Sequence, residues 1–578
     1  MKFEQTALAA APGELTMDHV RILNEIRSRD TLEQAFDCAL HDRTHTDYYF
    51  DYFEIDYVQA NRKQILDELA DELKHPEKYT PRLAYAYYPP KTSLCYRRMV
   101  YLPFKDLLIR YGFCIVLSKY LESTMSPRSF ANRRASGARA RVALLEDFST
   151  VSWPSFCEWQ RDSIKESTVL VRTDISSFYD SISHRYLVGA IAEELSLSSG
   201  SGIMKLFERL LSVTVVSYSQ ADSDIKHDEL NQGLPIGNSS EGYFANIYLN
   251  RVDGKMNEFA ASKGLSFGRY NDDMRIFGKS REDALTGIRV LQELLLVKGL
   301  NLNGSKTMIA EDSTGIEDLR SKVYEFESSH GDEGQEDEEE VLTGADEPPT
   351  SSLKAHVDDH FHEFKKRFEP GQIIDKDNVA KDFCKFMSAK SADGTRLLQL
   401  SDRLPQHVQM LGEVMGNWQG SGKHAAWLLV QSAFDSRVPV NTRKSAGLLI
   451  FALLETTGVS SYLKYRILHH LVKLRQKSRG HQFRYLDKLT TKSRTRLQKL
   501  IPQFVAEPAF ELNIVALHTL RCLGASPEEI KAVVKTGSRQ PNAEPILNAI
   551  SYMASSSTIS TAPAISQARE EDDIESPY

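Results

Sequence analysis

An acidic segment with almost no large apolar residues divides the chain. Residues 325–350 read EFESSHGDEGQEDEEEVLTGADEPPT, and from Gly331 to Glu347 there are nine acids and no base. Such a segment cannot bury enough apolar surface to offset the entropy lost on ordering, so it is predicted to be a linker or exposed insertion. Because single hydrophobic cores stop growing near ~250–300 residues, a chain of 578 residues is expected to fold as separate units on its two sides.

The two sides differ in hydrophobic periodicity. Upstream, apolar β-branched runs such as STVLVRTDI alternate with helical patterns such as GIRVLQELLLVKGL, which predicts an α+β or α/β domain. Downstream, nearly every periodic segment is helical, which predicts an all-α region with repeat-like stacking of helical hairpins. The predicted units are an N-terminal helical extension at 1–85, the α+β domain at 86–324, the linker at 325–350, the helical region at 351–553, and a disordered acidic tail at 554–578.

The formal charge of −8 conceals a basic body. Leaving out the nine negative charges of 331–347 and the net four of 561–578 gives +5 for the remaining residues. A basic folded surface with acidic segments suits phosphate binding. No apolar run reaches the ~18–20 residues that cross a bilayer, and the N-terminus lacks the apolar core of a signal peptide. We therefore expect a cytoplasmic protein without a membrane partner.

Two adjacent aspartates lie at a predicted turn. In FGRYNDDMRIFG, Phe267 to Gly278, apolar strand-like runs flank the turn that carries Asp272 and Asp273. Asn-Asp tolerates the left-handed backbone of a tight hairpin, so the flanking strands can hold both carboxylates rigidly. On its own, this pattern is also that of an ordinary hairpin.

A third carboxylate follows another apolar strand. TVLVRTDISSFYDSI places Asp174 at the strand end, where it could meet the hairpin aspartates. Clustered carboxylates repel one another and are tolerable only around cations. Hard oxygen ligands suit Mg²⁺, with Mn²⁺ as the alternative, and two ions ~3.5–4 Å apart stabilise both the attacking and the leaving oxygen. The combination predicts phosphoryl-transfer chemistry.

Four motifs together resemble those of reverse transcriptases across roughly residues 90 to 310. They are DISSFYD, GLPIGNSSEGYFANIYL (233–249), YNDD and GLNLNGSKT (299–307), in the family's order. The resemblance implies a right-hand polymerase whose fingers and palm, with a palm sheet, occupy 86–324. It also implies an RNA-directed DNA polymerase, a nucleotidyltransferase that uses dNTPs and has RNA and/or DNA as template or product.

The same resemblance implies roles for five residues of these motifs. Asp174 and Asp272 would be the main metal ligands, with Asp273 auxiliary. Tyr179 would lie under the sugar and leave no room for a 2′-hydroxyl. Lys306 would approach the pyrophosphate as charge stabiliser or general acid; the alternative is an exposed loop lysine.

Basic residues upstream resemble the fingers of the family. KTSLCYRRMVYLPFKDLLIR carries Arg97 and Arg98, and we expect Arg98, or else Arg97, to grip the triphosphate because its planar fork bonds two phosphate oxygens at once. In SPRSFANRRASG, Arg133 or Arg134 is predicted to touch template phosphate, with a solvated basic loop as the alternative. Gly237, in the middle motif, is assigned to the nucleotide site.

The middle motif points to a subgroup. Pro235-Ile236-Gly237 stands where retroviral, retron and group II intron enzymes have Pro-Gln-Gly, and GLPIG with a following Ala-Xaa-Ile-Tyr-Leu helix resembles the abortive-infection and defence-associated bacterial reverse transcriptases. That resemblance implies antiphage defence, with synthesis that is templated, protein-primed or template-independent. A non-coding RNA and a second copy of the chain are further expected partners.

The helical region contains a basic stretch between residues 462 and 499. Lys473 and Arg475 are predicted to contact the nascent strand, with a solvated helix face as the alternative. A different hypothesis makes this region an RNA-binding toxin, an RNase that uses Arg475 and His481. Candidate priming tyrosines are Tyr462, Tyr465, Tyr485 and Tyr578.

Overall fold

The structure is a computed structural model in which nine stretches of the chain are described. These are residues 19–45, 51–89, 96–218, 225–311, 421–434, 440–456, 459–476, 482–507 and 509–536. The predicted acidic linker, the predicted tail, His481 and Tyr578 lie outside them. None of the described helices is long and apolar enough to span a membrane.

The first described elements are helices that complete the core of the α+β unit. They are α1 (His19–Ile26), α2 (Arg29–His45), α3 (Tyr52–Ala60) and α4 (Arg62–Glu72), followed by the 3-10 turn η1 (Pro76–Lys78). Helices α1 and α2 pack against α5 (Phe104–Leu121), and Ile26 and Phe36 belong to the same buried cluster as Leu108. The predicted N-terminal helices are therefore part of that hydrophobic core.

A first sheet, with strand order β2-β1-β4-β5, separates two hydrophobic cores. Its strands are β1 (Ala84–Tyr87), β2 (Met99–Tyr101), β4 (Thr214–Tyr218) and β5 (Ile225–Glu229). Because side chains alternate along a strand, Ala84 and Ala86 face the core of the α+β unit. Tyr85 and Tyr87 face a second core, which is shared with the C-terminal helices.

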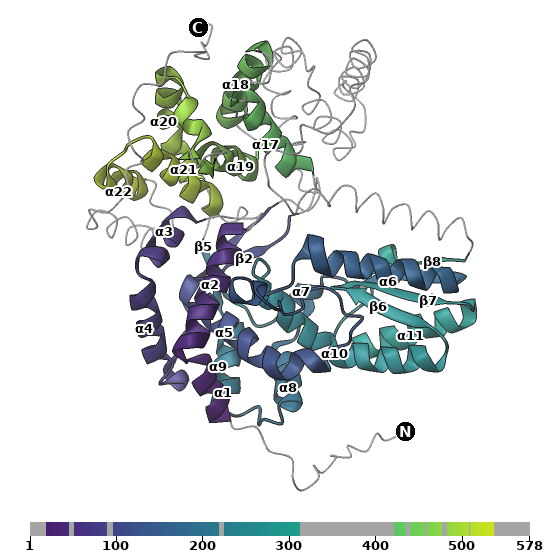
Figure 1. Cartoon of the computed structure of the whole chain (residues 1–578). Helices are drawn as coiled ribbons and strands as arrows, with labels where there is room; N and C mark the ends of the chain where they lie inside the picture. Colours follow the sequence, from purple (N-terminus) through teal and green to yellow (C-terminus); the bar gives the residue numbers. More distant parts are fainter. Residues whose placement is uncertain are drawn as a thin grey trace, which may run out of the picture.

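The second sheet is antiparallel, with the order β6-β7-β3-β8. Its strands are β3 (Val169–Asp174), β6 (Ser266–Tyr270), β7 (Asp273–Gly278) and β8 (Met308–Ala310). Val171 and Ile276 face the main core beside α10 (Ser239–Ser262) and α11 (Arg281–Val297). Leu170 and Phe277 face α6 (Trp153–Glu166). Figure 1 shows α6 on one side of this sheet and α10 and α11 on the other.

Helix α11 shows how local sequence sets these elements. Ser280 caps its start by accepting a hydrogen bond from the backbone N–H of Asp283 at 3.3 Å, and Glu282 and Asp283 lie in the first turn, where negative charge is favoured. The helix ends at Val297, shortly before Gly299, whose φ of +77° suits glycine. The predicted helical periodicity here is confirmed.

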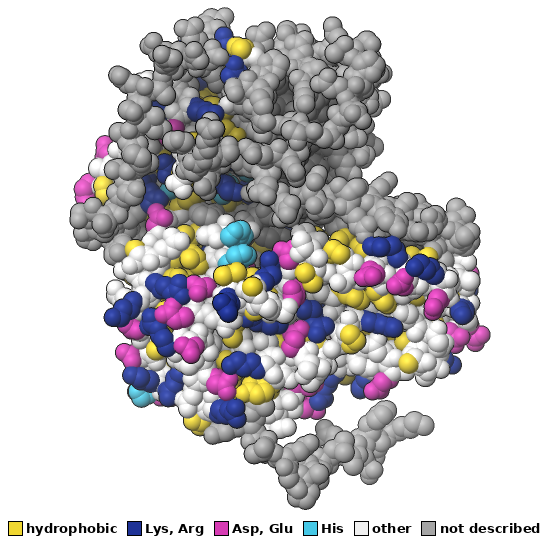
Figure 2. All heavy atoms as spheres, in the orientation of Figure 1, with side chains coloured by type: hydrophobic (Ala, Val, Ile, Leu, Met, Phe, Trp, Pro, Cys, Tyr) yellow, Lys and Arg dark blue, Asp and Glu magenta, His cyan; other side chains and the backbone are white. Residues whose placement is uncertain are grey.

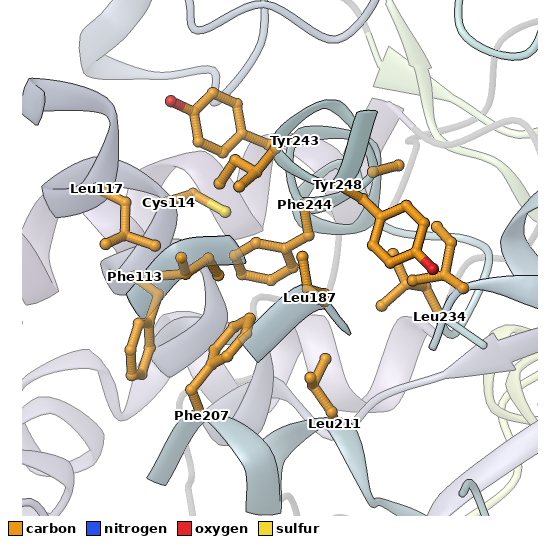
Figure 3. Close-up of a cluster of buried hydrophobic side chains, with 14 of the residues drawn as sticks. Phe113, Cys114, Leu117, Leu187, Phe207, Leu211, Leu234, Tyr243, Phe244 and Tyr248 are labelled. Carbon is orange, nitrogen blue, oxygen red and sulfur yellow. The ribbon is translucent and has the colours of Figure 1, made fainter. Parts of the chain in front are cut away.

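The main core is aromatic where α5, α9 (Gly202–Leu211) and α10 meet. Phe113 and Phe207 have ring centroids 5.2 Å apart, and Phe207 and Phe244 are 4.9 Å apart (Figure 3). Helix α8 (His184–Glu194) contributes Leu187 to the same cluster. The remaining short elements before residue 311 are η2 (Glu122–Thr124), η3 (Arg139–Arg141), the π-helical turn η4 (Phe148–Ser152), α7 (Phe178–Ser181) and η5 (Gly304–Lys306).

The described C-terminal part is mostly helical. Its elements are α17 (Ser421–Phe434), α18 (Val440–Glu455), α19 (Ser461–Val472), β9 (Arg475–Gln476), β10 (Gln482–Phe483), η6 (Tyr485–Lys488), α20 (Thr491–Ala506), α21 (Phe510–Cys522) and α22 (Pro527–Thr536). The all-α prediction misses the short antiparallel ladder of β9 and β10. Helix α19 ends at Val472, where the N–H of Lys473 bonds the His469 carbonyl, and the chain then forms the β9–β10 ladder.

The C-terminal helices pack on the outer face of the first sheet. The rings of Tyr85 on β1 and Phe510 on α21 stack with centroids 5.0 Å apart. Tyr52 on α3 stacks on His518 at 3.8 Å, and its hydroxyl lies 3.0 Å from Nδ1 of His469. These contacts join residues more than 400 positions apart into one apolar cluster.

Candidate active site

Three carboxylates meet at one end of the second sheet. Strand β3 ends at Asp174, β7 begins at Asp273, and the two residues are opposite each other in the antiparallel register. Asp272 occupies the turn before β7, and its carbonyl accepts a hydrogen bond from the backbone N–H of Ile175 at 3.3 Å. The predicted hairpin and the predicted strand end are confirmed. The structure brings the backbones of the three acids together.

The left-handed backbone predicted for the Asn-Asp turn is confirmed at Asn271, and the side-chain hydrogen bonds of this residue add a role that the sequence did not indicate. This residue has a φ of +55°, a left-handed conformation that asparagine adopts more readily than most residues. Its amide Nδ2 donates to Oδ1 of Asp272 at 3.2 Å, and its Oδ1 accepts from the Tyr179 hydroxyl at 3.2 Å. Asn271 thus links the expected sugar-contacting tyrosine to a carboxylate.

In this arrangement the ionised form of the Asp272 carboxyl group is disfavoured. Burial, followed by the negative charges of Asp174 and Asp273, raises its pKa to about 6, although nearby Lys306 opposes the shift. Negative charge that is desolvated and crowded is relieved by a bound cation. The carboxylates of Asp174 and Asp272 are hard oxygen ligands and fit a divalent ion of the Mg²⁺ type.

Asp174 is paired with the loop that follows α11. Nζ of Lys306 donates to Oδ2 of Asp174 at 3.0 Å, and the backbone N–H of Asn303 donates to the Asp174 carbonyl at 2.7 Å. Lys306 is 58% exposed, so its ammonium group faces solvent at the edge of the carboxylates. The structure therefore places this predicted site residue next to the aspartates.

Asp273 differs from the other two acids because Arg275 holds it. Both guanidinium Nη atoms contact its carboxylate, and the Nη2–Oδ2 distance is 2.7 Å. Nε of Arg172 lies 3.7 Å from Oδ1 of the same carboxylate. Among the described residues, no three His, Cys, Asp or Glu side chains are arranged as a ready metal site. Asp273 could join one only by releasing Arg275, a residue that the sequence interpretation had not singled out.

The first half of the middle motif lies against the tyrosine. The backbone N–H of Leu234 donates to the Tyr179 carbonyl at 2.9 Å, and that of Gly233 donates to the Ile182 carbonyl at 2.8 Å. Gly233 has a φ of +87°, and a Cβ there would lie 3.0 Å from Cα of Asp180. Only glycine fits this close approach without strain.

The second half of the motif reaches the first sheet. The Ile236 carbonyl accepts from the N–H of Val100 at 2.8 Å. Gly237 has a φ of +126°, and a Cβ there would lie 3.3 Å from Cε of Met99 on β2. Arg97 and Arg98 directly precede this strand and are half-buried. Within the described part of the chain, neither guanidinium has a hydrogen-bond or ion-pair partner. They are available to an anionic ligand.

Arg133 and Arg134 have partners inside the protein. Nε of Arg133 contacts Oε1 of Glu122 at 2.6 Å, and Arg134 donates to the carbonyls of Ala143 and Leu144 at 3.0 and 2.5 Å. These bonds fold the loop between η2 and α6. The structure does not present the two guanidinium groups as free phosphate ligands, and their predicted template contact stays a prediction.

The basic residues of the helical region are also engaged. Arg475 is 7% exposed and lies over the Tyr485 ring, 5.0 Å from its centroid, so it would have to leave this packing to meet a nucleic-acid strand. Lys473 is half-buried at the end of α19. The candidate priming residues Tyr462, Tyr465 and Tyr485 are buried.

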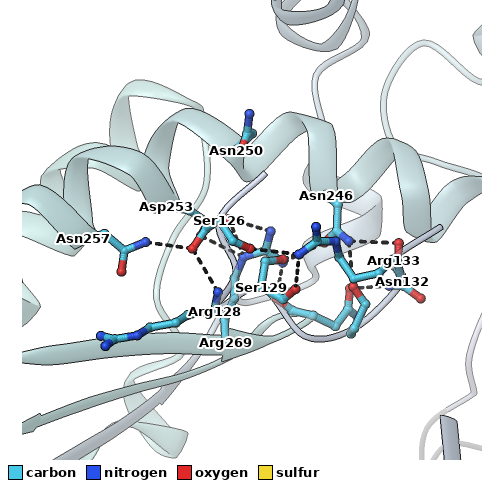
Figure 4. A network of polar contacts seen from close by, with 12 residues as sticks. Ser126, Arg128, Ser129, Asn132, Arg133, Asn246, Asn250, Asp253, Asn257 and Arg269 are labelled. Carbon is cyan, nitrogen blue, oxygen red and sulfur yellow. Dashed lines mark hydrogen bonds and ion pairs between the residues drawn. The ribbon is translucent and has the colours of Figure 1, made fainter. Parts of the chain in front are cut away.

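A buried polar network anchors the hairpin to α10 (Figure 4). Nε of Arg269 on β6 bonds Oδ1 of Asp253 at 2.8 Å, while its Nη1 bonds Oδ1 of Asn246 at 2.9 Å and the Asn271 carbonyl at 3.1 Å. Arg269, Asp253 and Asn246 are each 1% exposed. A buried ion pair must be closely complemented, and this one fixes the backbone of the catalytic turn. In the sequence, the polar Asn246 within the apolar run FANIYL is the signal that could have indicated this buried network.

The surface charge is mixed on the visible face of the α+β unit. Figure 2 shows Lys and Arg side chains interspersed with Asp and Glu. Acids and bases are also paired along the described helices, as in Arg29 with Glu33 and Arg62 with Asp37. The basic surplus of the sequence therefore does not mark a single patch on this face.

Comparison with known proteins agrees with the geometry. Residues 114–331 match the family model of the reverse transcriptase (RNA-dependent DNA polymerase), a range that includes all three aspartates and Lys306. Among solved structures, apo telomerase from Candida tropicalis, truncated from its C-terminal domain, is 15% identical, with a TM-score of 0.30. The match covers 40% of this chain and half of the telomerase chain.

Proposed function

Because residues 114–331 are a reverse transcriptase domain, the domain of an RNA-directed DNA polymerase, we propose that the chain extends a DNA strand from dNTPs at Asp174, Asp272 and Asp273. The observation that carries this proposal is the pairing of Asp174 with Asp273 in register, with Asp272 in the adjoining turn. The raised pKa of Asp272 supports it, since the crowded carboxylates call for a cation.

Each neighbouring residue has a task in this reaction. Asp174 and Asp272 would hold Mg²⁺ or Mn²⁺, which when bound would supply stabilisation of the charge on the attacking and leaving oxygens. Tyr179, whose hydroxyl donates to Asn271, would lie beneath the sugar and exclude a 2′-hydroxyl. Lys306, next to Asp174, would stabilise the charge of the pyrophosphate, and Arg98, which has no ion-pair partner among the described residues, would bind the triphosphate.

The proposed biological role is antiphage defence. It is supported by the GLPIG motif and by a helical region that packs on the first sheet. Neither feature identifies the template, so synthesis copied from RNA, primed on protein or made without a template are separate forms of the proposal. Sequencing the nucleic acid that copurifies with the full chain distinguishes copied DNA from untemplated tracts.

The polymerase proposal is tested by incorporation of labelled dNMP with Mg²⁺ or Mn²⁺. We expect Asp174→Asn and Asp272→Asn each to lose roughly 10²–10³-fold or more of the rate, because each removes charge from the reacting centre. Asp283→Asn is the matched control, since Asp283 lies on α11 and its nearest basic partner is Lys263 at 3.7 Å. Full activity in Asp174→Asn and Asp272→Asn would refute the assignment.

The defence proposal is tested separately by phage plating on cells that express the chain. Protection that disappears with Asp272→Asn but persists with Asp283→Asn would support it. Protection that persists in a variant without dNMP incorporation would show that the polymerase is not the protective activity.

A further inference from the structure

Asn132, in the loop between η2 and η3, reaches the turn that carries the aspartates. Its Nδ2 donates to Oδ1 of Asn271 at 3.2 Å. Its own backbone has a φ of +55° and is held by Asn246, whose Nδ2 donates to the carbonyls of Asn132 and Ala131 at 3.0 and 2.7 Å (Figure 4). The amide is therefore presented by a backbone that is itself fixed to helix α10.

The bond to Asn271 connects Asn132, through a chain of hydrogen bonds, to two further residues of the site. Asn271 accepts from the Tyr179 hydroxyl at 3.2 Å and donates to Oδ1 of Asp272 at 3.2 Å. One side chain from a distant loop thus controls the amide that orients both the tyrosine ring and a carboxylate.

Gly242 on α10 is shaped to receive this amide. A Cβ at position 242 would lie 2.5 Å from Cγ, 2.6 Å from Oδ1 and 2.8 Å from Nδ2 of Asn132. Glycine inside a helix costs about 1 kcal/mol relative to alanine. Because the Asn132 amide packs so closely against the helix backbone, this buried helical position has a physical reason to be glycine.

We infer that Asn132 is a positioning residue for the nucleotide sugar: through Asn271 it fixes the Tyr179 ring and so sets the preference for deoxynucleotides over ribonucleotides. The inference rests on the proposed polymerase function. A tyrosine ring that loses its hydroxyl tether can rotate away from the sugar, which opens space for a 2′-hydroxyl. The same loss lets Asp272 turn from its reacting position.

Two single variants remove the contact in different ways. Asn132→Gly deletes the amide and keeps a residue that tolerates the left-handed backbone, which alanine would strain. Gly242→Ala leaves Asn132 in place and displaces its amide. We expect each variant of the full chain to lower the ratio of kcat/KM for dNTP to kcat/KM for rNTP by roughly tenfold, the scale of one lost hydrogen bond.

The double variant makes the test specific to the contact. Once Asn132 has become glycine, alanine at 242 has no side chain to displace, so Asn132→Gly with Gly242→Ala should equal Asn132→Gly alone. Gly254→Ala is the control on the same helix, since a Cβ there meets nothing within 4 Å, and its selectivity should match wild type. Thermal unfolding of each variant checks that it folds; if Asn132→Gly does not fold, Gly242→Ala decides alone.

The outcomes separate this inference from the proposed function. Active single variants with the wild-type sugar ratio, or additive losses in the double variant, would overturn the role of Asn132 and leave the polymerase proposal standing. A folded wild-type chain that incorporates neither dNTP nor rNTP would overturn the proposed function and this inference with it.

Discussion

Arg275 and Asp273 form a bidentate ion pair two residues apart on the same face of β7, with Nη2 2.7 Å from Oδ2. Residues i and i+2 of a strand share a face, so the pair follows from the sequence DMR once the strand is known. Among the described residues, no Lys or Arg forms an ion pair with the adjacent Asp272, whose pKa is raised. The two neighbouring acids of the hairpin are therefore chemically unequal.

This inequality predicts unequal effects of substitution. Asp273→Asn should retain at least roughly tenfold more dNMP incorporation than Asp272→Asn, because Arg275 already neutralises much of the charge that Asp273 brings, and a lost charge interaction is on the order of a tenfold or larger effect. Single-turnover rates at saturating Mg²⁺ make the comparison. Equal losses in the two variants would contradict it.

The raised pKa of Asp272 predicts that its ionised carboxylate lowers the free energy of unfolding of the metal-free protein. Its pKa is raised from 3.8 to about 6, so the folded metal-free protein holds the proton more tightly than the unfolded chain, and unfolding free energy falls as the pH rises from about 4 to about 6. Asp272→Asn should therefore stabilise the metal-free protein by about 1–3 kcal/mol at neutral pH. Chemical unfolding in EDTA at pH 4 and pH 7.5 measures this, and the gain should be absent at the lower pH.

Cation binding should follow the same titration with the opposite trend. Below pH 6 the Asp272 carboxyl is largely protonated and competes poorly for a metal, while above pH 6 it is ionised. The rise in melting temperature on adding Mg²⁺ should therefore grow between pH 5 and pH 7. In Asp272→Asn this pH dependence should flatten; a dependence that is unchanged would assign the titration to another group.

Substitution of Gly233 is predicted to distort the backbone of the motif locally. Gly233→Ala places a Cβ 3.0–3.1 Å from backbone atoms of Asp180 and Tyr179 in a positive-φ conformation, which costs about 1–3 kcal/mol. The motif should shift away from Tyr179, lowering both stability and kcat/KM for dNTP. Gly254→Ala, at an open helical position, should be neutral or stabilising by up to about 1 kcal/mol and serves as the matched comparison.

The stacking of Phe510 on Tyr85 predicts that the C-terminal helices support the first sheet. Phe510→Ala removes a buried ring at this contact and should lower the unfolding free energy by about 3–5 kcal/mol. Val440→Ala is the control, because Val440 is 48% exposed. If Phe510→Ala unfolds at the wild-type denaturant concentration, the packing of α21 on β1 is not stabilising.

Local patterns predicted much of the fold and part of the site. The hairpin at Asn271 and Asp272, the strand ending in Asp174, and the periodicity of α11 each depend on a few neighbouring residues, so they could be read directly. The two-residue strands β9 and β10 were missed because segments that short have no resolvable period.

The remaining features depend on contacts between distant segments. Arg133 and Arg134 looked like phosphate ligands, but whether an arginine is free depends on acids and carbonyls elsewhere, here Glu122 and Ala143. The hydrogen bond from Asn132 to Asn271 joins residues 139 positions apart, and no rule of sequence spacing predicts it. Only the packed structure shows which polar side chains hold the site in place.

The first sheet gives the helical region a mechanical connection to the nucleotide. Met99 on β2 contributes to the cluster that contains Phe510, and it also lies beside Gly237, while Arg98 directly precedes the strand. A molecule that tilts α21 would therefore move β2 and, with it, the residues next to the proposed triphosphate site. Recognition by the C-terminal helices and synthesis at the carboxylates can thus be coupled through the displacement of a single short strand.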